Sequence, residues 1–161
     1  IKSFDKVLST LIACSACDGN LLLNLGPSPE GRLVEGQIEV LERVGDWLSA
    51  YGESVYGTRG GPVLPAASHA GSSQPSVLTT HRGATAYFHI PKDGQDHYER
   101  VRLAGLNQDI VEFEVLVGGE VRIDKDENGF YIDVTAFDGK EPELLVKARL
   151  DAPVDGIRLG Y

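Results

Sequence analysis

The hydrophobic pattern of this chain changes its period near Gly60, and this change limits the architectures that the chain can adopt. Before Gly60, apolar residues recur every three or four positions, which is the spacing of one face of an α-helix. After Gly60, short segments alternate between apolar and polar residues, as strands with one buried face do. The sequence therefore predicts an α/β part followed by an all-β part.

Two helices and one strand are predicted in the first part. Ser3 can cap a helix that ends at the Asp18-Gly19 turn. Asn20–Asn24 is an apolar run between turn residues, which predicts a strand buried on both faces. A second helix is predicted from about residue 35 to residue 51, with Gly52 as a left-handed C-terminal cap. This order is typical of an α/β protein with a parallel sheet.

The second part predicts an antiparallel β-sandwich, because several short strands follow one another between turns. Residues 59–75 are rich in Gly, Pro, Ser and Ala and predict a linker or crossing loop. Tyr87 and His89 share one strand face, and we expect them to be half-exposed, although they could form a small platform on which a sugar stacks. The predicted strands cover residues 76–80, 85–90, 111–117, 121–124, 130–135, 144–150 and 157–159. In the strand over 111–117, the valines and Phe113 are expected on one face and the glutamates on the other.

Length and charge exclude several classes of protein. The 161 residues are too few for a complete (β/α)8 barrel, which needs roughly 250. The net charge of −9 argues against nucleic-acid binding and against binding to anionic membranes. The chain begins at Ile1 and contains no Met, so we expect it to be a piece of a longer protein whose compartment it does not reveal.

The clusters of reactive side chains favour structural roles. Cys14 and Cys17 form a CxxC motif at the end of the first helix, where the helix dipole would not activate a thiol, so we interpret them as small buried residues. The segment from Asp124 to Gly129 resembles the opening of a calcium loop but lacks its final acidic ligand, so we interpret it as a hairpin turn. The four acidic residues of the second helix predict a solvent-exposed stripe; they are Glu35, Glu39, Glu42 and Asp46. No metal site or cofactor is predicted.

One stretch is specific enough to suggest a family. Residues 18–31 read DGNLLLNLGPSPEG, residues 44–48 read VGDWL and residues 51–58 read YGESVYGT. This arrangement closely resembles the α-L-fucosidases of glycoside hydrolase family 29, in which the first stretch forms the last barrel strand and its loop. Residues 59–62, with the context of residues 9–18, look most like the branch that prefers α-1,3/1,4-linked fucose. Glu30 and Leu33 replace the usual Asp and Ile, which are mild departures.

The resemblance implies an α/β remnant of a (β/α)8 barrel over residues 1–61 and an antiparallel β-sandwich over residues 62–161. It implies a retaining hydrolase of terminal α-linked L-fucose, acting on a fucosylated oligosaccharide or glycoconjugate. Both catalytic carboxyl groups of the family lie on earlier barrel strands, so no catalytic residue is assigned in this chain. Because barrel sites lie where strands end, Asn24, Gly26 and Pro27 are the candidate substrate-binding residues.

Two other hypotheses stay open. The chain could be a non-catalytic carbohydrate-binding or structural β-sandwich module, or it could complete an enzyme by associating with another chain. If the first interpretation holds, the preceding barrel segment is its partner. We then expect residues 1 to about 60 to be unstable or associated when isolated, because one strand and two helices cannot bury a barrel core.

Overall fold

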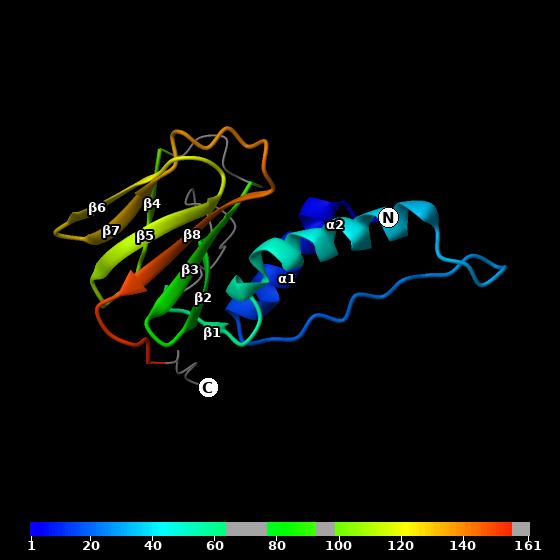
Figure 1. Ribbon diagram of the computed structural model, residues 1–161, viewed down its shortest axis with the longest axis horizontal. Helices are drawn as coiled ribbons and strands as arrows, with labels where there is room; N and C mark the ends of the chain where they lie inside the picture. The colour runs from blue at the N-terminus through cyan, green and yellow to red at the C-terminus, as the bar shows by residue number, and fades with distance from the viewer. Residues whose placement is uncertain (64–76, 93–98, 156–161) are drawn as a thin grey trace.

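The computed structural model describes residues 1–63, 77–92 and 99–155, and it places two antiparallel sheets beside two helices (Figure 1). The five-stranded sheet has the order β1-β2-β3-β8-β5, and the three-stranded sheet has the order β4-β7-β6. The helices are α1 (Phe4–Ala16), α2 (Glu35–Tyr51) and the short 3-10 helix η1 (Gly52–Ser54). The strands are β1 (Arg59–Gly60), β2 (Leu78–Arg82), β3 (Thr85–Pro91), β4 (Arg100–Arg102), β5 (Ile110–Val117), β6 (Arg122–Asp126), β7 (Gly129–Asp133) and β8 (Glu143–Leu150).

The two sheets enclose the larger apolar core. Phe88 and Ile90 of β3 and Val146 of β8 meet Val101 of β4 and Ile132 of β7, and all five side chains are almost completely buried. Strands β2 and β3 form one antiparallel hairpin and β6 and β7 form another, so strands predicted next to each other in the sequence are neighbours in the sheets. These observations agree with the predicted antiparallel β-sandwich. The predicted strand over residues 157–159, most of the predicted linker, and His69 and His97 lie outside the described residues.

The opposite face of the five-stranded sheet is covered by the helices, which form a third layer (Figure 1). Tyr87 and Leu145 of the sheet pack with the apolar face of α1 and with Trp47 of α2. Tyr87 and His89 are both 0% exposed. The expectation of a half-exposed pair is therefore wrong, and so is the sugar-stacking platform, because the helices occupy the space above these strands.

Helix α1 begins as predicted, since the backbone N–H of Lys6 donates to the Ser3 hydroxyl at 3.3 Å. At its other end, Cys17 is exposed and Cys14 is only half-buried, which corrects the prediction of two buried cysteines. Both are free thiols.

Helix α2 also has the predicted bounds, and its four acidic residues form the expected exposed stripe. Ile38, which lies near the start of this helix, is 40% exposed. Gly52 does not adopt the predicted left-handed conformation, because its φ of −61° continues into η1. A Cβ atom at Gly52 would lie 2.8 Å from the ring of Tyr56, which is 62% exposed, so a larger residue here would require that ring to move.

The predicted strand Asn20–Asn24 does not form. This segment is extended, but the described residues offer no neighbouring strand with which its backbone could form a ladder. Its side chains alternate between half-buried and exposed, and Leu22 is 92% exposed. The first part of the chain therefore consists of helices and an extended segment, and the predicted parallel sheet is absent from the described residues.

Strand β5 forms where predicted, but its apolar residues do not share one face. Register shifts lie between Ile110 and Glu112 and between Val115 and Val117. Val115 packs against the core between the sheets, whereas Val117 packs under the helices. These irregularities bend an edge strand whose Phe113 is 42% exposed, and bulges and charged residues protect such edges from pairing with other chains.

The end of α1 docks on β1 through a close backbone approach. The Gly60 N–H donates to Asp18 Oδ1 at 3.0 Å, and a Cβ atom at Gly60 would lie 2.2 Å from the Ala16 carbonyl oxygen. No side chain fits in that space, so β1 and the end of α1 depend on glycine at this position.

We expect Gly60→Ala to lower the free energy of unfolding by about 1–3 kcal/mol, because the added methyl group separates α1 from the sheet. Urea unfolding followed by circular dichroism measures this loss. Gly45→Ala is the matched control, because nothing lies within 4 Å of its Cβ position in α2. This control should gain about 0.5–1 kcal/mol in helical stability. Equal stability of Gly60→Ala and the wild type would contradict the close contact.

Candidate functional site

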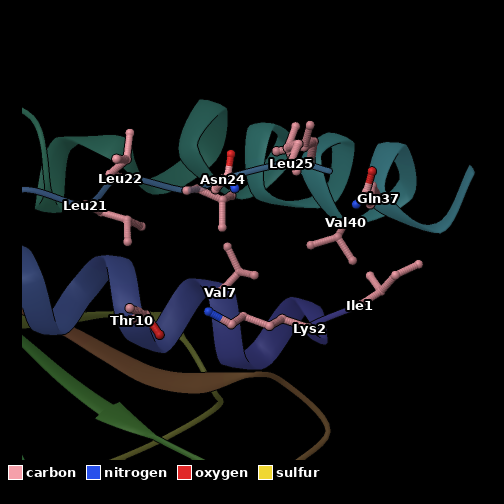
Figure 2. Close-up of a pocket in the computed structure, with 12 residues that line it drawn as sticks. Ile1, Lys2, Val7, Thr10, Leu21, Leu22, Asn24, Leu25, Gln37 and Val40 are labelled. Carbon is pink, nitrogen blue, oxygen red and sulfur yellow. The ribbon is translucent and has the colours of Figure 1, made fainter. Parts of the chain in front are cut away.

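A cavity of about 260 Å³ lies between α1, α2 and the extended segment that joins them (Figure 2). The cavity exists because the extended segment runs past both helices without pairing, so side chains rather than backbone bonds hold it there. Its lining is mostly aliphatic: Val7 of α1, Leu21, Leu23 and Leu25 of the segment, and Val40 and Leu41 of α2. Polar groups reach it from Lys2, Thr10, Asn24 and Gln37.

The three predicted substrate-binding residues are only partly brought together. Asn24 lines the cavity, and Figure 2 shows it on the extended segment in front of α2. Gly26 and Pro27 follow on the exposed part of the loop and do not line the cavity. Nothing lies within 4 Å of a Cβ position at Gly26. The role of all three in substrate binding stays a prediction.

The cavity has no carboxyl group among its lining residues. Hydrolysis of a glycosidic bond needs two carboxyl groups on opposite sides of the bond. The acidic stripe of α2 is exposed and does not contribute to the lining. This cavity, as the described residues line it, therefore does not contain the pair of carboxyl groups that cleaves such a bond.

The most deeply buried ionisable residues lie beneath the helices, away from this cavity. His89 Nδ1 lies 3.0 Å from Glu143 Oε2, and the two side chains are 0% and 1% exposed. A substrate has no access to them, so the pair supports the structure. Sequence reasoning missed it because the two residues are 54 positions apart and each strand carries other polar residues, so no local pattern distinguishes this pair.

A second polar group joins the end of α2 to the sheet. Glu53 accepts hydrogen bonds from the Tyr87 hydroxyl at 3.1 Å and from Lys147 Nζ at 2.9 Å. The hydrogen bond from Lys147 holds the pKa of Glu53 below its ordinary value of 4.5. Burial of Tyr87 beside this carboxylate raises the pKa of its phenol. Glu53 lies in the YGESVYGT stretch, so one role of that stretch is to attach the helical part to the sandwich.

The other clusters have structural partners. Asp126 pairs with Gly129 across the β6–β7 turn and its Oδ1 accepts from the Asn128 N–H at 2.7 Å, so the predicted hairpin turn is confirmed. His81 is 5% exposed, and burial lowers its pKa. Within residues 1–63, 77–92 and 99–155, no three His, Cys, Asp or Glu residues are grouped so that they could hold a metal ion. No helix in the same ranges is long and apolar enough to cross a membrane.

Comparison with known proteins connects the helical part to one family. Residues 1–53 match the family model described as α-L-fucosidase. An α-L-fucosidase of Branchiostoma floridae is 38% identical over 55 residues, which is 34% of this chain and 12% of that protein. Tissue α-L-fucosidase of Homo sapiens is 33% identical over 92 residues, covering 55% of this chain and 19% of the human protein.

The fold extends the similarity through the sandwich. The structure of α-L-fucosidase isoenzyme 1 from Paenibacillus thiaminolyticus aligns with a TM-score of 0.69 and 26% identity. The alignment covers 93% of this chain and 35% of that chain. This chain therefore spans about a third of the solved structure, and the sequence matches cover at most a fifth of the curated relatives described above.

Removing one partner of the buried pair should be far more costly than breaking an exposed pair. We expect Glu143→Ala to lower the free energy of unfolding by about 3–5 kcal/mol, because it leaves His89 buried without its partner. The control is Glu112→Ala, which breaks an exposed ion pair with Arg149 in the same sheet and should change stability little. Urea unfolding compares the two, and similar losses would contradict a special role for the buried pair.

The lowered pKa of Glu53 predicts a pH dependence with a definite sign. The ionised carboxylate is favoured in the folded chain, so its contribution is complete above the unfolded value of 4.5 and is lost as pH falls through the lower folded value. Glu53→Gln should therefore reduce the loss of stability on acidification below pH 4.5. Unfolding curves of the wild type and this variant at several pH values test this, and parallel pH profiles would contradict it.

Proposed function

We propose, from the relationship of this chain to the α-L-fucosidase family over residues 1–53, that it forms the C-terminal part of a retaining α-L-fucosidase. Residues 1–61 supply the end of the catalytic barrel, and residues 62–161 supply the C-terminal sandwich. The whole enzyme hydrolyses terminal α-linked L-fucose from a glycan. Residues 59–62 support the narrower proposal of α-1,3/1,4-linked substrates.

The observation that carries this proposal is the open apolar surface of the family-matched segment. Leu22 is 92% exposed, and Leu33, Val34 and Ile38 are 40–44% exposed. Soluble proteins rarely leave such a group of large apolar side chains uncovered. Neighbouring barrel strands would cover this surface and would give the extended backbone of residues 20–24 its hydrogen-bonding partners.

In this arrangement the chain helps to position the substrate, and it does not itself cleave the glycosidic bond. The two catalytic carboxyl groups of a retaining glycosidase stand about 5–5.5 Å apart and come from the remainder of the barrel. Asn24 lines the cavity beside the segment, and its amide can hydrogen-bond a sugar hydroxyl. Gly26 and Pro27 then shape the rim of the pocket. The burial of Tyr87 and His89 removes the feature that had favoured an independent carbohydrate-binding module.

The proposal is tested by assaying an aryl α-L-fucoside with this chain alone and with the longer protein that carries the rest of the barrel. The chain alone should give no turnover, and the longer protein should be active. In the longer protein, Asn24→Ala should lower kcat/KM about 10-fold, which corresponds to the loss of about 1.4 kcal/mol of transition-state binding. The matched control is Asn20→Ala, an exposed residue of the same segment.

Turnover by the chain alone would contradict the placement of catalysis outside it. Equal kcat/KM for the Asn24 and Asn20 variants would remove Asn24 from the substrate site but would leave the family assignment intact. The instability of residues 1 to about 60 in isolation stays a prediction, and slow hydrogen exchange at Leu21–Asn24 in a monomer would contradict it.

A further inference from the structure

Cys14 and Cys17 are a pair of reactive side chains that neither the candidate site nor the sandwich core uses. Both are free thiols at the end of α1, where Cys17 is exposed and Cys14 is half-buried. Reagents in solution therefore reach one sulfur fully and the other in part. Accessible thiols can take part in oxidation and disulfide exchange, whereas buried structural cysteines are inert.

The last turn of α1 holds the backbones of the two cysteines at a separation that suits a disulfide. The Cys17 N–H donates to the carbonyl oxygens of Ala13 and Cys14, both at 3.2 Å, so this turn combines the α-helical and the 3-10 pattern. Residues three positions apart have Cα atoms about 5 Å apart in an α-helix and about 6 Å apart, eclipsed, in a 3-10 turn. Both values lie within the range of about 4.4–6.8 Å that disulfides span.

The side chains can complete this approach without unwinding the helix. In a regular helix the Cβ atoms of such a pair lie about 5–6 Å apart, and a disulfide brings them to within about 4.5 Å. Cys17 is the C-cap of α1, with φ −105° and ψ 16°, so it has already left the helical conformation. Its Cβ atom can therefore move toward Cys14 while the turns before it stay intact.

The position at the end of the helix also affects how stable such a disulfide is. In disulfide oxidoreductases the CxxC motif opens a helix, where the dipole stabilises a thiolate and makes the disulfide a strong oxidant. Cys14 and Cys17 close a helix instead, and the last turn of α1 carries no basic residue. The reduced state therefore receives no such stabilisation, and a disulfide here is a lasting modification rather than an oxidant of other proteins.

We propose that Cys14 and Cys17 are a site of reversible oxidation, and that they form a disulfide by exchange with a small disulfide such as oxidised glutathione. The exposed Cys17 thiol gives its proton to water and attacks one glutathione sulfur, and the other glutathione leaves as a thiolate. The Cys14 thiol, deprotonated in the same way, then attacks the Cys17 sulfur and releases the second glutathione. The protein loses two protons and two electrons, and the glutathione sulfurs gain the electrons. This inference does not depend on the proposed enzymatic activity.

The disulfide restrains the residue that attaches β1 to the end of α1. Asp18 follows Cys17 directly and has a positive φ of 52°. Its Oδ1 accepts from the Gly60 N–H at 3.0 Å and lies 3.8 Å from Nη1 of Arg59. Because the bridge fixes the turn that presents this carboxylate, oxidation strengthens the attachment of the helical part to the sheet.

The test equilibrates the wild-type chain with mixtures of reduced and oxidised glutathione and then blocks the remaining thiols with an alkylating reagent. Mass spectrometry measures the oxidised fraction, which has lost two hydrogen atoms and carries no alkyl group. We expect the equilibrium constant for the disulfide to be at least about 10-fold larger in the folded chain than in urea, because α1 has already ordered the two residues between the cysteines. Equal constants would overturn the inference, since the helix would then contribute nothing.

Two matched variants test the order of attack. Cys14→Ser should accumulate a glutathione adduct at Cys17, because the thiol that would displace glutathione is missing. Cys17→Ser should form less adduct, because its remaining thiol is half-buried. A lasting glutathione adduct on the wild-type chain, or disulfide-linked dimers in place of the internal bridge, would overturn the proposal. Amide hydrogen exchange at Gly60 should slow on oxidation, and unchanged exchange would overturn the restraint on Asp18.

Discussion

The packing of α1 on the five-stranded sheet is the contact on which the rest of the structure depends. Phe4, Leu8 and Ile12 cover a sheet face that would otherwise expose Tyr87 and Leu145. With that face covered, β3 and β8 are buried on both sides. Alternate residues of each strand enter different cores, so a shift of one residue in register would exchange the two faces and place polar groups in the sandwich.

This shared core makes the helical part and the sandwich a single packing unit, although they differ in secondary structure. Polar contacts at its margins fix the angle between them: Glu53 binds Tyr87 and Lys147, and the Thr80 hydroxyl donates to the Ser54 carbonyl at 2.5 Å. The Gly60 contact adds a third attachment at the end of α1. A segment attached at several separate points cannot rotate on the sheet, so any site on its outer surface keeps a fixed orientation.

The sequence predicts those features that depend on local pattern and misses those that depend on a distant neighbour. Helix α1 and the two hairpins follow from caps, turns and periodicity. The apolar run at residues 20–24 has the composition of a strand, yet composition supplies no pairing partner. The burial of His89 could not be predicted either, because it depends on where α1 and α2 come to lie.

The residues of the candidate site were likewise predicted only where a local signal or a resemblance pointed to them. Asn24 came from resemblance to a family, and the structure places it beside a cavity, whereas Gly26 and Pro27 stay on the exposed loop. The pair of His89 and Glu143 came from neither pattern nor resemblance. Its partners meet only after β3 and β8 have paired, so no short window of sequence contains the signal.

The exposed large apolar side chains of the described residues are concentrated in the helical part of the chain. Among the residues that the structure describes, eight large apolar side chains are exposed, and five of them lie within residues 1–53: Ile1, Leu22, Leu33, Val34 and Ile38. The apolar face of α1 is covered by the sandwich. The extended segment and the start of α2 have no layer that covers their apolar side chains in the same way. Since burying apolar surface is the main driving force of folding, an additional layer on the uncovered side would stabilise the fold most. That side also carries the cavity and Asn24, so covering it would enclose the candidate substrate site and stabilise the segment in one step.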